Sequence, residues 1–228
     1  LLPRGSVRVK PARATGGRSQ WVVRDAMALD EVLAGLSTIA RDGVVLERNL
    51  RNPRTLSVGQ AIIGTTRMSY HGLQRLVRNH AGEFVYGGSE LTVVRGDLED
   101  LLGLQLEPAL RLAIDQARMY HAVVVSSFDG FIASRINYDV AQGLDDTGRW
   151  CSGVLEPSWR VGGASAAEIA AMEVLHDDPE RMQVRASCVE VYGGAEPPAG
   201  GCVYYDDIDP AVGRITKFSF VEPHADPT

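Results

Sequence analysis

Short runs in which apolar and polar residues alternate dominate this chain of 228 residues. A period of two places successive side chains on opposite faces of a strand, so these runs predict β-strands. Glycine, proline, asparagine and aspartate separate most of the runs, as turns require. Strands are predicted at residues 7–10, 20–24, 44–46, 55–63, 68–76, 90–95, 135–142, 149–159 and 217–221.

Apolar residues recur at helical spacing in only a few segments. Asp25 is a candidate N-cap for a first helix, which ends at the stop signal Gly43. Pro108 suits the first turn of a second helix, which we expect to reach about Tyr120.

A third helix is predicted over residues 169–175, because Ser165 and Glu168 have the spacing of a capping box in front of it. The proline- and glycine-rich ending, residues 196–228, is expected to wrap the surface with a single strand. Strands follow strands along most of the chain. The predicted class is therefore α+β, with antiparallel sheets and flanking helices.

Composition narrows the class of protein. The net charge of −6 argues against a sequence-independent nucleic-acid binder, which needs a basic field. We find no apolar run of about 18 residues and no secretion signal, so we expect a cytoplasmic protein that does not bind membranes. Val7–Lys10 already resembles a strand, which leads us to expect an upstream region.

The segment with most chemical information is a predicted hairpin carrying two carboxylates. Alternation places Asn137 and Asp139 on one face, and the turn at 144–148 returns a second strand that can bring Glu156 opposite them. Two converging carboxylates repel each other unless a cation lies between them, and such oxygen ligands suit magnesium. Arg160 could bind a phosphate or a carboxylate. Alternatively, these residues are the polar face of an exposed hairpin.

A glycine-containing loop follows the first predicted strand. Lys10 precedes the tip Gly16-Gly17-Arg18, and consecutive amides around glycine can bind an anion such as a polyphosphate. Only two lysines occur in the chain, Lys10 and Lys217, among many arginines. A glycine hairpin tip is also a common turn, and no Walker pattern is present.

The third segment of interest is an apolar strand, Val44–Leu46, that becomes polar at Glu47, Arg48 and Asn49 before Leu50. A strand edge of this kind can offer backbone groups to a purine and a carboxylate to ribose hydroxyls. It can equally be a strand that ends in a loop.

Taken in order, these segments resemble the ATP-grasp superfamily over about residues 7–175. Lys10 and Gly16-Gly17-Arg18 are similar to its phosphate lysine and flexible glycine loop. Residues 46–50, with Glu47, Arg48 and Leu50, resemble its adenine-binding hinge. The hairpin with Asp139, Glu156 and Arg160 is similar to its metal-binding hairpin. Closer similarity is to bacterial ATP-grasp-like proteins, sometimes labelled biotin carboxylase-like, that are uncharacterised.

Two positions depart from the superfamily pattern. Ser158 stands where an asparagine metal ligand is usual, and its hydroxyl binds a cation more weakly. Thr55 stands where many relatives carry a glutamate.

The resemblance implies two subdomains and a reaction. Residues 1–50 would form the lid subdomain, and residues 51–228 the catalytic subdomain with its C-terminal extension. The implied activity is an ATP-dependent ligase that phosphorylates a small carboxylate and passes the acyl phosphate to an amine or similar nucleophile. Lys10 and Arg160 would act in catalysis, and Asp139, Glu156 and Ser158 would bind Mg²⁺, with Mn²⁺ as a substitute.

Two other functions stay open from the sequence. One is a nucleotide-binding protein with weak or no turnover, which the serine at position 158 favours. The other is an interaction domain that binds no nucleotide. Whether the chain forms a homo-oligomer is left open as well.

Overall fold

The computed structural model describes residues 2–12, 20–36 and 39–222, and these form a mixed α+β fold. The helices are η1 (Leu2–Arg4), α1 (Ala26–Gly35), α2 (Ile39–Asp42), η2 (Asp100–Gly103), α3 (Pro108–Ser127) and α4 (Ser165–Asp177). The strands are β1 (Val7–Pro11), β2 (Trp21–Val23), β3 (Val44–Arg48), β4 (Arg51–Ile63), β5 (Thr66–Arg78), β6 (Phe84–Arg95), β7 (Arg135–Leu144), β8 (Trp150–Ser158), β9 (Gln183–Tyr192), β10 (Cys202–Asp209) and β11 (Gly213–Val221).

The chain divides into two compact units. Unit 1 comprises Leu1–Arg54 and Ala141–Ser152, and unit 2 comprises Thr55–Val140 and Gly153–Thr228. The boundary therefore falls inside strands β4, β7 and β8, whereas the sequence suggested one at residue 50. Unit 1 contains the turn that joins β7 to β8 in addition to the N-terminal segment.

Unit 1 is built on a three-stranded antiparallel sheet in the order β2-β1-β3. Val7, Val9 and Val23 are buried and form its core, against which the apolar side of α1 packs. The Asp25 side chain accepts a hydrogen bond from the Ala28 amide at 2.9 Å, which confirms the predicted N-cap.

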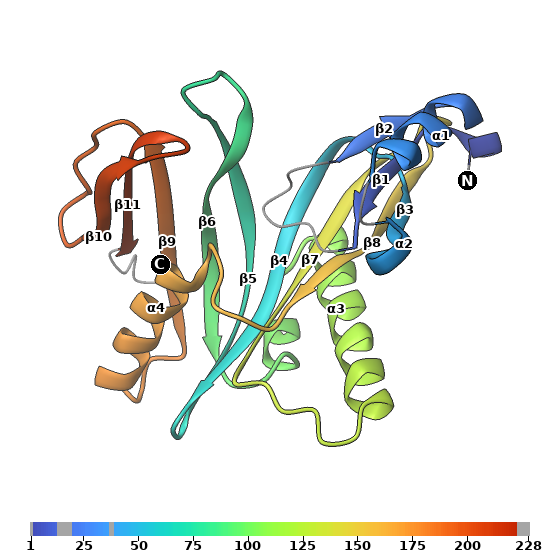
Figure 1. The fold of residues 1–228 in the computed structure, drawn as a ribbon. Coiled ribbons are helices and arrows are strands. Elements are labelled where there is room, and N and C mark those ends of the chain that lie inside the picture. Colours follow the sequence, from blue (N-terminus) through green and yellow to red (C-terminus); the bar gives the residue numbers. More distant parts are fainter. Residues whose placement is uncertain (1, 13–19, 37–38, 223–228) are drawn as a thin grey trace. The chain divides into compact units, whose positions relative to one another are not determined.

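A large antiparallel sheet in the order β10-β11-β9-β6-β5-β4-β7-β8 runs through unit 2 (Figure 1). Side chains alternate across it, so each of its two faces has its own buried cluster. On one face α3 packs against β4 and β7 through Ile114, Ala117 and Tyr138, among others. On the other face α4 packs against β5, β6 and β9.

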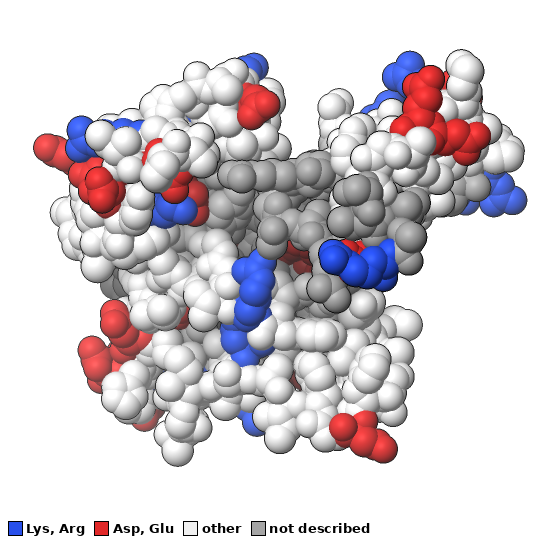
Figure 2. All heavy atoms as spheres, viewed as in Figure 1, with Lys and Arg blue, Asp and Glu red and all other residues white. Residues whose placement is uncertain are grey.

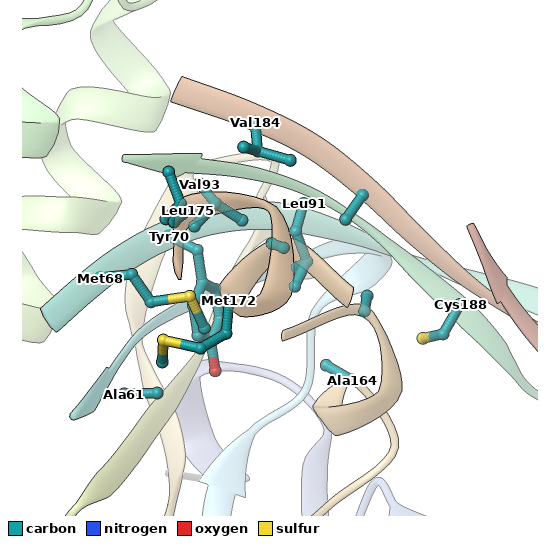
Figure 3. Close-up of a cluster of buried hydrophobic side chains, with 13 residues drawn as sticks. Ala61, Met68, Tyr70, Leu91, Val93, Ala164, Met172, Leu175, Val184 and Cys188 are labelled. Atoms are coloured by element: carbon teal, nitrogen blue, oxygen red, sulfur yellow. The ribbon is translucent and has the colours of Figure 1, made fainter. Parts of the chain in front are cut away.

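Tyr70 lies at the centre of the cluster under α4. Figure 3 shows its ring among Met68, Met172 and Leu175, with the hydroxyl oxygen pointing out of this apolar group. The ring is completely buried. A buried tyrosine hydroxyl needs a hydrogen-bond partner, so its surroundings are polar on that side.

Two predictions about local structure were wrong. The second of the strands predicted at 68–76 and 90–95 begins earlier than expected, at Phe84, so Gly87 and Gly88 lie within β6, where the register with β5 shifts by one residue. Gly88 has φ +125°, and a Cβ there would meet the Cys188 carbonyl oxygen, so the bulge needs glycine.

The predicted capping box at α4 is also absent. Ala164 occupies the N-cap, and the Ser165 hydroxyl instead accepts a hydrogen bond from the Gly162 amide at 3.0 Å. Glu168 is buried, and its carboxylate binds Tyr70 and Arg135 of the sheet and accepts a long hydrogen bond from Ser165 Oγ at 3.5 Å, with none from the Ser165 amide described. Ser165 and Glu168 thus have the spacing of a capping box but do not cap the helix.

The C-terminal part contains more sheet than expected. Strands β9 and β10 were not predicted, and β11 begins at Gly213, earlier than residue 217. Acidic and basic side chains are interspersed over β10 and β11, at one edge of the large sheet (Figure 2). One such pair is Arg214 with Asp206, at 3.2 Å.

Candidate functional site

Three polar side chains of β7 lie on the α4 face of unit 2. Arg135, Asn137 and Asp139 alternate with Ile136 and Tyr138, which are buried in the cluster under α3. The predicted alternation of this strand is therefore confirmed. It brings a cation, an amide and a carboxylate onto one line of the sheet.

Asp139 is held by two neutral donors. Asn137 Nδ2 donates to its Oδ1 at 2.9 Å, and Ser57 Oγ, on the neighbouring strand β4, donates to the same atom at 3.3 Å. The Ser57 hydroxyl in turn accepts a hydrogen bond from Gln74 Nε2 at 3.1 Å. These contacts fix the plane of the half-buried carboxylate without neutralising its charge.

Next to Asn137 lies a buried network centred on Tyr70. The Tyr70 hydroxyl lies 2.7 Å from Glu168 Oε1 and 3.1 Å from Asn137 Oδ1. Burial, followed by the charge of Glu168, raises the pKa of Tyr70 well above its usual range. Tyr70 therefore stays protonated and acts as a donor.

Arg135 completes this network with a bidentate ion pair to Glu168. Its Nε and Nη2 lie 2.9 and 2.7 Å from the two carboxylate oxygens of Glu168. Burial by itself would lower the pKa of Arg135, but the hydrogen bonds and charge of Glu168 together with the neighbouring Tyr70 outweigh it, and the pKa is raised. The pair is a fixed structural feature of the α4 face.

The same guanidinium reaches strand β8 and the segment after it. Arg135 Nη1 donates to Ser158 O and Oγ, each at 3.2 Å, and to the carbonyl oxygen of Arg160. Ser158 thus faces the α4 side, together with Asp139. Val154, four residues earlier, packs against the opposite cluster, so regular alternation is interrupted between these two positions of β8.

Glu156 lies on β8 between Val154 and Ser158 and is exposed. Strands β7 and β8 are neighbours in the sheet, so Asp139 and Glu156 lie on adjacent strands, as a hairpin requires. Arg160 is exposed, and its Nη1 donates to the carbonyl oxygen of Val161 at 2.9 Å.

Unit 1 contains the other candidate residues. Lys10 on β1 and Glu47 on β3 form an ion pair with a distance of 2.6 Å between Nζ and Oε2, and both are largely buried. The structure therefore brings together a candidate phosphate contact and a candidate ribose contact. Leu50 is half-buried in the link between β3 and β4. Gly16, Gly17 and Arg18 lie outside the described residues.

Arg48 points elsewhere, toward the turn between β7 and β8. Its Nη1 lies 3.1 Å from Asp145 Oδ2. A hydrogen bond from the Thr147 hydroxyl, together with backbone amides and Arg48, holds the pKa of Asp145 at about 2. Arg48 is thus committed to a structural contact within unit 1.

Among the described residues, no three histidine, cysteine, aspartate or glutamate side chains converge to form a preassembled metal centre. Magnesium that arrives with a nucleotide needs only one or two carboxylates, because phosphate oxygens and water fill the other positions. Asp139 fits this requirement. Ser158 fits it less well, because the Arg135 guanidinium, 3.2 Å from its Oγ, would repel a cation bound there.

Three residues of the buried network were missed at the sequence level: Tyr70, Arg135 and Glu168. Arg135 could have been found, since it continues the two-residue spacing of Asn137 and Asp139. Tyr70 and Glu168 carry no local signal, because 98 residues separate them and only the packing of α4 joins them.

No helix in the described ranges combines the length and apolar character that crossing a membrane requires.

Comparison with known proteins identifies a family for this chain but no activity. No curated protein and no solved structure matches the chain. Residues 1–219 match the family described as a protein of unknown function, DUF3182. The match covers nearly the whole chain, which therefore belongs to the DUF3182 family.

Proposed function

We propose that this protein is an ATP- and Mg²⁺-dependent ligase of the ATP-grasp type that activates a small carboxylate. The observation that carries the proposal is the position of Asp139. It lies on the polar face of β7, oriented by Asn137 and Ser57, and the neighbouring strand β8 carries Glu156. A carboxylate held in this way suits a magnesium ion that also binds phosphate oxygens.

In the proposed reaction an oxygen of the substrate carboxylate attacks the γ-phosphorus of ATP. The bond from that phosphorus to the bridging oxygen breaks, which gives an acyl phosphate and ADP. An amine or similar nucleophile then attacks the acyl carbon, loses a proton and releases inorganic phosphate. Such catalysis consists mainly of positioning and charge neutralisation.

The protein's own residues have separate roles in this proposal. Asp139 and Glu156 bind the magnesium ion. Lys10 contacts phosphate oxygens, for which its ion pair with Glu47 has to rearrange or be shared. Arg160, whose side chain is exposed, orients the carboxylate or the transferring phosphoryl group.

One observation favours a second function, a nucleotide-binding protein with little turnover. Ser158 takes the place of the usual asparagine ligand, and its hydroxyl accepts a hydrogen bond from Arg135. A site with one ligand fewer binds the metal less firmly and can retain nucleotide binding while losing rate.

Release of ADP distinguishes the two functions. Purified protein is incubated with Mg-ATP, hydroxylamine and pools of small carboxylates, because hydroxylamine traps acyl phosphates as hydroxamates. The ligase predicts ADP release and hydroxamate formation that depend on a particular pool and disappear in Asp139→Ala. Binding of Mg-ATP with no ADP in any pool would favour the second function.

A further inference from the structure

A continuous chain of hydrogen bonds connects the helix α4 to Asp139. It runs from Glu168 to the Tyr70 hydroxyl at 2.7 Å, from there to Asn137 Oδ1 at 3.1 Å, and from Asn137 Nδ2 to Asp139 at 2.9 Å. Tyr70, Asn137 and Glu168 are buried. The terminal carboxylate is therefore attached to a rigid interior.

The orientation of Asn137 follows from what its neighbours can accept. Asp139 Oδ1 accepts a hydrogen bond, so the amide must present Nδ2 to it. That leaves the amide oxygen facing the Tyr70 hydroxyl. Tyr70 has a single proton, which is shared between Glu168 Oε1 at 2.7 Å and this oxygen at 3.1 Å. A rotated amide would turn Oδ1 toward the Asp139 carboxylate and lose the bond to it.

A second branch begins at the same carboxylate. Glu168 binds Arg135 through two hydrogen bonds, and Arg135 donates to the backbone carbonyl oxygens of Ser158 and Arg160. A guanidinium fork that is fixed on one side presents its remaining N–H groups in a defined direction. Glu168 thus constrains β7 and the segment after β8 together.

We propose that Tyr70 and Glu168 are positioning residues for the nucleotide-bound magnesium site. Tyr70 orients Asp139 through Asn137, and Glu168 holds Tyr70 together with the segment from Ser158 to Arg160. The inference rests on the proposed function, because it assigns these residues a role at the same site. Residues that orient a metal ligand affect metal affinity by about 10- to 100-fold in other proteins.

Tyr86 offers a matched control on the same sheet. Tyr86 is half-buried, and its hydroxyl lies 2.7 Å from Ser89 Oγ and 3.5 Å from Cys188 Sγ. Tyr86 has no described contact with Asn137, Asp139 or Glu168. Loss of either hydroxyl therefore removes one hydrogen-bonding group from the sheet, but of the two only Tyr70 has a described connection to Asp139.

The test measures the affinity for ATP by titration calorimetry at saturating Mg²⁺ and again with EDTA. Tyr70→Phe is expected to weaken binding with Mg²⁺ by about 10-fold and to leave binding in EDTA unchanged. Tyr86→Phe is expected to change neither affinity. Asn137→Ser, which breaks the same chain one step later, provides a second variant and is expected to match Tyr70→Phe.

The outcomes separate this inference from the proposed function. If the wild type binds Mg-ATP and both Tyr70→Phe and Asn137→Ser bind it equally well, the positioning role is wrong and the ligase proposal stands. Equal weakening by Tyr86→Phe would also refute the positioning role, because it would show a general loss of stability. If the wild type shows no magnesium-dependent binding, the proposed function fails and this inference with it.

Discussion

Arg135 and Glu168 form a bidentate ion pair on the α4 face of unit 2, with Nη2 2.7 Å from Oε1 and Nε 2.9 Å from Oε2. The two side chains are only 12% and 5% exposed. Removing one member of a buried pair leaves an uncompensated charge, which costs more than the pair itself contributes.

Glu168→Gln is therefore expected to lower the free energy of unfolding by about 3–5 kcal/mol, measured by urea denaturation. Glu99→Gln is the control, since the exposed Glu99 side chain pairs with Arg118 at 2.7 Å. Its loss is expected to stay below about 1 kcal/mol. Similar losses in the two variants would show that the Arg135–Glu168 pair is not specially desolvated.

His71 makes stability depend on pH in a defined range. Burial lowers its pKa from 6.5 to about 4 in the folded protein. Above pH 6.5 the histidine is neutral in both states, and below it the unfolded chain binds a proton that the folded protein does not. The free energy of unfolding should fall by up to about 3 kcal/mol between pH 6.5 and 4.

His71→Gln removes this titration and is expected to flatten the profile in that range. Asp145, with a pKa of about 2, does not interfere, because its contribution is present above its ordinary pKa of 3.8 and is lost only as the pH falls toward 2. Urea denaturation at several pH values measures the difference. Parallel profiles for the wild type and the variant would contradict the burial of His71.

The two lysines of the chain allow a paired experiment. Lys10 pairs with Glu47 at 2.6 Å, and Lys217 pairs with Glu190 at 3.0 Å. If Lys10 contacts phosphate, Lys10→Met should weaken Mg-ATP binding by at least about 10-fold, or about 1.4 kcal/mol. Lys217→Met, which also breaks a lysine–glutamate pair, should leave the affinity unchanged. The reverse ranking in calorimetry would exclude the proposed role of Lys10.

The three cysteines should react with iodoacetamide at very different rates. Cys202 is exposed, Cys151 is intermediate and Cys188 is buried. Burial also raises the pKa of the Cys188 thiol, which lowers its thiolate fraction. Mass spectrometry should find Cys202 modified first and Cys188 last. Early modification of Cys188 in folded protein would show that β9 is not packed under α4.

Most of the sheet could be predicted because alternation is a local property of the sequence. The strands from residue 55 to 76 and the hairpin around residues 135–158 were found in nearly their observed positions. Strand β6 was predicted too short. The pair Gly87-Gly88 has the sequence of a turn, but in the structure it forms a β-bulge inside the strand. Strand β9 was missed because its apolar and polar residues follow no clear alternation, and its neighbours in the sheet, β6 and β11, are distant in sequence.

The candidate site was predictable only in part, for a similar reason. Asp139 lies where alternation placed it, on a single strand. Its supporting residues Ser57, Tyr70 and Glu168 come from β4, β5 and α4, and only tertiary packing brings them to β7. Patterns along the chain therefore identify the carboxylate but not what orients it.

A thermal-shift titration with ATP, with and without Mg²⁺, tests the central claim most directly. It compares the wild type with Asp139→Ala, Glu156→Ala and the control Asp177→Asn, a change at an exposed carboxylate on the last turn of α4. We predict that ATP raises the melting temperature only with Mg²⁺, in the wild type and in the control, and that both alanine variants lose this shift. Equal shifts in all four proteins, or none in the wild type, would contradict the assignment of a magnesium-nucleotide site to these two strands.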